Sequence, residues 1–230
     1  MSRATDVVTV IVGSGDDAKM FGIHAHLLQK GSRFFAAALK GDWKEAHTRT
    51  VRLPEDDPEV FEVYASWLYE KCLSTQVKNE DAAPLAEETM LIRAYVHGHK
   101  YGDDTFCDAV IDTLRQACNS IDVFSRYGDC ANIYNNTSEG SMLRKLVIDR
   151  WLHCGHEPWI EVTPAEKALL PREFLWEYMC AAVCALGKEL QLTPSNAPWL
   201  TDKCAYHLHK KTGGPCYLTH SDLAKHDAET

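Results

Sequence analysis

The chain has 230 residues, 45% of them hydrophobic, which is enough to bury a core without disulfide bonds. Its 24 basic and 33 acidic residues give a net charge of -9, and no block of lysine or arginine concentrates positive charge. Because binding to a phosphate backbone depends on clustered cations, we expect no nucleic-acid partner. The longest apolar runs are too short to cross a bilayer, and the polar residues 1–6 predict no secretory signal. We therefore expect a cytoplasmic or nuclear protein with no membrane partner.

The nine cysteines are odd in number and accompany no export signal, so we expect reduced thiols rather than a disulfide framework.

The first predicted elements form a β-hairpin. Residues 6–12 are β-branched almost throughout, which predicts a strand covered on both faces. Glycine and aspartate at 13–17 predict a turn, and residues 19–23 predict the second strand. After the hairpin we expect two short helices and a third strand, at 24–29, 32–39 and 50–53.

Helices dominate the sequence that follows. Asp57 is a capping residue and Pro58 suits the first turn of a helix, while Asp103 or Asp104 is expected to cap a later one. Apolar side chains recur at helical spacing and predict helices at 58–70, 85–100 and 104–117. Three side chains are expected in the core, namely Phe35, Trp67 and Leu114.

The C-terminal half is predicted to be helical and then irregular. An apolar face at 143–151 predicts one helix, and residues 163–166 have the spacing of a capping box. A further helix is expected at 171–186, after which prolines and glycines predict loops. We expect a first domain at 1–118, a helical extension at 119–187 and a loop-rich tail at 188–230.

Five residues near the N-terminus share a distinctive spacing, F-x-x-H-x-x-x-L-x-x-x-S-x-x-F, formed by Phe21, His24, Leu28, Ser32 and Phe35. With the valine-rich strand before it and the run Trp67, Leu68 and Tyr69 after it, this pattern resembles the BTB/POZ family over roughly residues 5–118. The chain is similar to the BTB proteins abundant in filamentous fungi. The resemblance implies an α+β fold, a small mixed sheet flanked by helices, here followed by an all-helical C-terminal extension.

The same resemblance implies a protein-interaction module that oligomerises with itself or docks a partner. In the adaptor branch of the family the partner is a cullin scaffold of ubiquitin ligases. A structural or assembly protein with no ligase role is the alternative. No catalytic motif supports an enzyme, since the sequence has no phosphate-binding loop, no G-x-S-x-G elbow and no His-Glu-x-x-His.

One short segment is a candidate for partner binding. Trp43, Lys44 and Glu45 match the hydrophobic-x-Glu motif with which adaptor-type BTB domains contact a cullin. The resemblance thus implies a docking role for these three residues. The alternative is that Trp43 covers the domain's own core and Glu45 is solvated.

A cysteine and histidine cluster near the C-terminus is a candidate metal site. Its members are Cys204, His207, His209, Cys216 and His220. Two thiolates and two imidazoles are what tetrahedral zinc requires, and metal binding could order a segment with few apolar residues. We expect His209 and His220 to be alternatives for one ligand position. No other cofactor is expected, and a simple polar tail without metal is the competing interpretation.

Overall fold

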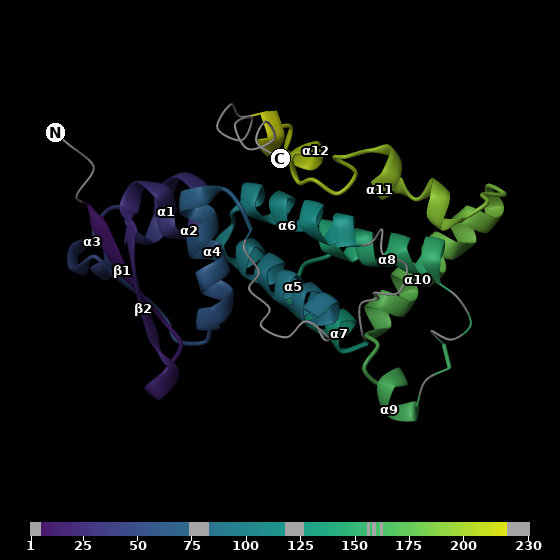
Figure 1. Ribbon diagram of the computed structural model, residues 1–230, viewed down its shortest axis with the longest axis horizontal. Helices are drawn as coiled ribbons and strands as arrows, with labels where there is room; N and C mark the ends of the chain where they lie inside the picture. Colours follow the sequence, from purple (N-terminus) through teal and green to yellow (C-terminus); the bar gives the residue numbers. More distant parts are fainter. Residues whose placement is uncertain are drawn as a thin grey trace. The chain divides into compact units, whose positions relative to one another are not determined.

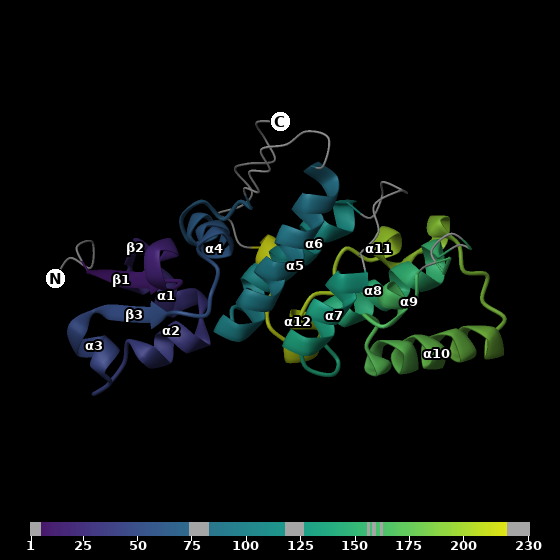
Figure 2. The same ribbon diagram turned by 90° about the horizontal axis from the view of Figure 1, so that it is seen from below.

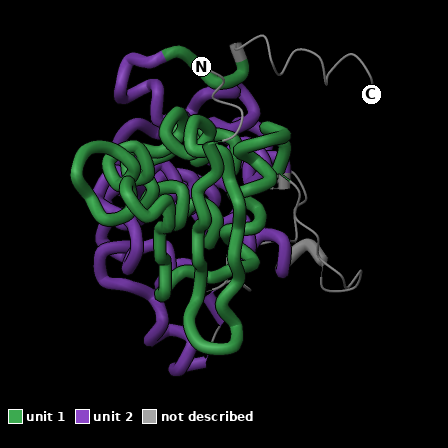
Figure 3. Tube along the Cα trace, turned by 90° about the vertical axis from the view of Figure 1, so that its left-hand side faces the viewer, with its two compact units in different colours: residues 1–76, 93–110, 215–230 green, residues 77–92, 111–214 purple. Residues whose placement is uncertain are grey.

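The computed structural model describes residues 6–73, 83–117, 127–155, 157, 160, 161 and 163–219. This part of the chain is mixed α+β and mostly helical, with one three-stranded sheet and twelve α-helices. The expected α+β class is therefore confirmed. Two compact units divide the chain: residues 1–76, 93–110 and 215–230 form the first, and residues 77–92 and 111–214 the second (Figure 3). The expected domain boundaries at 118 and 187 stay a prediction.

The sheet of the first unit begins with the predicted hairpin (Figure 1). Strand β1 (Val7–Val12) pairs with β2 (Lys19–His24) antiparallel and with β3 (Thr50–Leu53) parallel, in the order β2-β1-β3. Gly13 and Gly15 have positive φ angles of 85° and 64°, which the tight connection requires. Alternate valines of β1 are fully buried, but the other face is only half-covered. The prediction that both faces of this strand are covered was therefore wrong for one face.

Three short helices connect β2 to β3. Helices α1 (Ala25–Gly31) and α2 (Arg33–Ala38) are separated by Ser32, whose Oγ accepts from the backbone N–H of Phe35 at 3.1 Å. The same hydroxyl donates to the carbonyl of Tyr101 at 2.6 Å, which ties the cap to a later helix. Helix α3 (Lys44–Thr48), which the sequence pattern did not predict, leads directly into β3 (Figure 2).

The three helices expected next are present. They are α4 (Pro58–Glu70), α5 (Ala83–Tyr101) and α6 (Asp104–Ala117). The Asp57 carboxylate accepts from the N–H of Glu59 at 2.7 Å, and that of Asp103 accepts from the N–H of Phe106 at 3.0 Å. These carboxylates therefore cap α4 and α6, as predicted. The three expected core residues, Phe35, Trp67 and Leu114, are all buried.

The second unit is built from helices. They include α7 (Tyr127–Asn136), α8 (Met142–Cys154), α9 (Pro164–Lys167) and α10 (Arg172–Gly187), and both α7 and α10 pack against α8. Thr163 and Glu166 form the predicted capping box of α9. Arg150 of α8 and Glu88 of α5 form a buried ion pair with 2.6 Å between Nη1 and Oε1. The sequence pattern did not predict helix α7.

Short helical turns interrupt the loops near the C-terminus. They are η4 (Pro194–Asn196), α11 (Pro198–Thr201), α12 (His209–Thr212) and η5 (Tyr217–Thr219). A similar short turn, η2 (Gly15–Asp17), lies in the connection of the N-terminal hairpin. The described residues 188–219 therefore contain loops and turns too short to be independent helices. Among the described helices, none combines the length and the apolar character needed to cross a lipid bilayer.

We predict that Trp67→Ala lowers the free energy of unfolding by about 3–5 kcal/mol, because it leaves a cavity in the core. The indole is 2% exposed and packs against the rings of Phe106 and Tyr217. Chemical denaturation measures the change. Met20→Ala, at a side chain 76% exposed, is the matched control and should change stability by less than about 0.5 kcal/mol. A loss below about 1 kcal/mol for Trp67→Ala would contradict the core role.

Candidate metal centre

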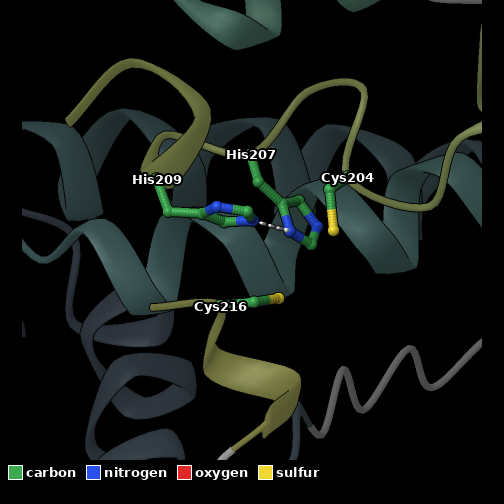
Figure 4. A group of neighbouring side chains, drawn as sticks. All are labelled: Cys204, His207, His209 and Cys216. Atoms are coloured by element: carbon green, nitrogen blue, oxygen red, sulfur yellow. Dashed lines mark hydrogen bonds between the residues drawn. The ribbon is translucent and has the colours of Figure 1, made fainter. Parts of the chain in front are cut away.

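Four potential ligands come together in the C-terminal segment. The side chains of Cys204, His207, His209 and Cys216 each offer one ligand atom, and these atoms all lie within 4.8 Å of one another. Figure 4 shows the four side chains converging on a common point. The cluster could therefore hold a metal ion.

Successive turns bring these residues close. The carboxylate of Asp202 accepts from the N–H of Cys204 at 2.9 Å, and the N–H of His207 bonds to the carbonyl of Cys204 at 3.1 Å. Gly213 ends α12 in the left-handed conformation, with φ of 72°, and so reverses the chain toward Cys216. Local backbone geometry thus gathers the ligands within a short stretch of sequence.

His207 is the buried member of the cluster, with 0% exposure. Its Nδ1 lies 3.3 Å from Nε2 of His209. Its Nε2 lies 3.1 Å from Oδ1 of Asp112 on α6. The two ring nitrogens of His207 therefore face different groups, one toward the ligand cluster and one toward a carboxylate.

The electrostatics of His209 favour the form that binds metals. Partial burial, together with the neighbouring His207 and Lys210, lowers the pKa of its imidazole below the ordinary value. The neutral imidazole has a free lone pair, which is the species that coordinates a metal ion.

The sequence predicted this cluster in large part. The structure brings Cys204, His207 and Cys216 together, as predicted. Among the described residues, His209 supplies the fourth ligand atom. His220, the other candidate for that position, lies outside the described residues.

Two residues of the centre's surroundings were missed. Asp112 lies against His207, and Nε of Arg115 lies 3.3 Å from the same Oδ1 of Asp112. Arg115 also donates from Nη1 to the carbonyl of Trp199 at 2.9 Å. No spacing rule links α6 to a segment so far along the chain, so no sequence signal could have found them.

The candidate docking segment lies elsewhere, at the start of α3. Trp43 is the N-cap residue of that helix and is 66% exposed. Lys44 is exposed and Glu45 is half-buried. The structure does not bring these three residues to the metal cluster's ligands, and their binding role stays a prediction.

An apolar stripe on α10 was also missed. Trp176, Met179, Val183 and Leu186 are all exposed, at successive spacings of 3, 4 and 3 residues. That spacing places them along one side of the helix. The signal was present in the sequence, but the opposite face, which includes the buried Phe174 and Ala185, carries apolar residues too.

Comparison with known proteins does not identify the chain. No protein-family model matches it, and no curated protein sequence does so either.

Proposed function

We propose that this chain is a protein-interaction protein whose N-terminal part is a BTB/POZ-type domain that docks a protein partner. The observation that carries the proposal is the exposure of Trp43, a large aromatic side chain flanked by charged residues at the edge of the first unit. Tryptophan is enriched among the residues that dominate binding energy at protein interfaces.

The architecture of the first unit supports the BTB/POZ interpretation. The five residues that carry the resemblance lie in the β2, α1 and α2 segment, where Leu28 and Phe35 are fully buried and Ser32 caps α2. A hairpin whose first strand also pairs in parallel with β3 is the small mixed sheet that the resemblance implies. The resemblance implies that the five residues determine the fold rather than form a binding site.

The exposure of Trp43 favours docking over the alternative role for this residue. At 66% exposure, most of the indole lies outside the core, whereas Trp67 is 2% exposed. Lys44 and Glu45 add charges that would orient a partner and raise its association rate rather than supply most of the affinity.

The partner that the resemblance implies is a cullin scaffold, which would make the protein a ubiquitin-ligase adaptor. Self-association is the second partner that the resemblance implies. The alternative function is a structural or assembly protein with no ligase role. Binding to a purified cullin separates the adaptor from this alternative.

We predict that Trp43→Ala weakens cullin binding by at least about 2 kcal/mol, the usual threshold for a binding hot spot. The melting temperature should hardly change, because the side chain is mostly exposed. Titration calorimetry with the purified cullin and a thermal melt measure the two quantities. Trp176→Ala, which removes a tryptophan that is 64% exposed on α10, is the matched control and should leave cullin binding unchanged.

Two results would count against this prediction. If the wild-type chain binds no cullin, the adaptor function is wrong and the structural alternative is favoured. If Trp43→Ala and Trp176→Ala weaken binding equally, Trp43 is not the specific anchor.

A second observation favours a structural role for a metal in the same chain, and we propose that the ion is zinc. For Zn–N bonds of about 2.0–2.1 Å, two nitrogens at the corners of a tetrahedron are about 3.3–3.4 Å apart. Nδ1 of His207 and Nε2 of His209 are 3.3 Å apart. The two imidazoles thus already have the separation of a tetrahedral zinc site.

The number of ligands favours a structural over a catalytic ion. Two cysteines and two histidines fill all four positions of a tetrahedral site, whereas catalytic zinc usually keeps one position open for water. The segment holds few buried apolar residues, so metal binding would contribute directly to its folding free energy.

We predict that the chain purified without an affinity tag contains about one equivalent of zinc. Replacing Cys204 and Cys216 by serine should abolish the zinc content, because serine is a poor zinc ligand. Replacing the exposed Cys180 and Cys184 by serine is the matched control and should leave the content unchanged. Elemental analysis by mass spectrometry measures the metal. Less than ~0.1 equivalent in the wild-type chain would show that no tight structural site exists.

A further inference from the structure

The environment of His207 restricts which of its ring nitrogens can bind a metal. A neutral imidazole carries one N–H, and an ionised carboxylate can only accept a hydrogen bond. Because Nε2 faces Oδ1 of Asp112 at 3.1 Å, the tautomer that fits carries its proton on Nε2. The lone pair then lies on Nδ1, which faces His209.

The carboxylate that makes this selection is itself held in place. Asp112 is 6% exposed, and Nε of Arg115 lies 3.3 Å from its Oδ1. Arg115 bonds in turn to the carbonyl of Trp199 on the C-terminal segment. The guanidinium of Arg115 and Nε2 of His207 therefore both lie close to the same carboxylate oxygen.

We infer that Asp112 is a positioning residue of the metal centre: it holds His207 as the Nε2–H tautomer and so presents Nδ1 to the ion. The inference rests on the proposed zinc site. Histidine ligands of metals commonly donate their second ring N–H to a carboxylate, which fixes the ring and raises its basicity. Asp112 lies 3.1 Å from Nε2 of His207 and belongs to α6, outside the segment that holds the ligands.

The contact between Asp112 and His207 has a competing explanation, in which it stabilises the fold and does not position a metal ligand. The second unit offers a matched carboxylate, because Asp149 of α8 accepts from the hydroxyl of Tyr206 at 2.9 Å. Asp149 therefore contacts Tyr206, the residue before His207 in the sequence, and Tyr206 is not one of the proposed metal ligands. A purely structural role would make the two aspartates behave alike.

We predict that Asp112→Asn weakens metal binding about 10–100-fold, because the amide no longer selects the tautomer of His207. Asp149→Asn should leave the affinity within about 3-fold of the wild-type value, since it touches no ligand. Asp112→Glu keeps a carboxylate and should recover part of the loss. Competition of zinc against a chromophoric chelator measures the affinities, and circular dichroism of each metal-free variant checks that it folds.

A spectroscopic readout tests the ligand atom directly. In the chain loaded with zinc, long-range ¹H–¹⁵N correlation spectra should show His207 protonated at Nε2 and metal-bound at Nδ1. Coordination through Nε2 of His207 would overturn the inference even if Asp112→Asn also weakened binding.

The outcomes separate this inference from the zinc proposal. If the wild-type chain binds zinc and Asp112→Asn binds it equally well, the positioning role is wrong while the zinc site stands. If both aspartate variants lose affinity equally, Asp112 acts through stability alone and the inference fails. If the wild-type chain binds no zinc, the proposed site itself is wrong and the role of Asp112 falls with it.

Discussion

The packing of the first unit depends on satisfying two buried tyrosine hydroxyls. Tyr64 and Tyr101 are fully buried, and they donate to Asp103 at 3.0 Å and to Asp56 at 2.8 Å. Burial, reinforced by these carboxylates, raises the pKa of both phenols, so the hydroxyls keep their protons and act as donors. The other oxygen of Asp103 caps α6 through the N–H of Phe106. One carboxylate therefore satisfies a core hydroxyl and also fixes where a helix begins.

The C-terminal segment depends on a different constraint, because it has little apolar surface to bury. Within described residues 188–219, only five side chains are buried, namely Ala197, Trp199, Tyr206, His207 and Tyr217. Polar contacts from Arg115 and Asp149 hold parts of the segment. Under the zinc proposal, metal binding would supply the stabilisation that a hydrophobic core supplies elsewhere, and one of the buried side chains would be a ligand.

The sequence predicted features that local chemistry determines and missed those that depend on distant contacts. The β-branched run of β1 and the capping carboxylates act within a few residues, so the hairpin and most long helices were found. Helix α7 was missed, and one of its contacts is with a residue of another helix, since the guanidinium of Arg144 on α8 donates to the carbonyl of Tyr134 at 2.8 Å. The metal ligands were found because they lie close in sequence. Asp112 was not, because only the fold brings it to His207.

Among the described residues, the exposed tryptophans Trp43 and Trp176 indicate two different kinds of surface. Trp43 is flanked by Lys44 and Glu45, so its surroundings combine one aromatic anchor with charges that can orient a partner. Trp176 instead begins the apolar stripe of α10, which suits non-directional contact with another apolar surface. Large exposed apolar surfaces are uncommon on monomeric proteins that bind nothing. Under the proposed interaction function, these two surfaces would be separate sites for different partners.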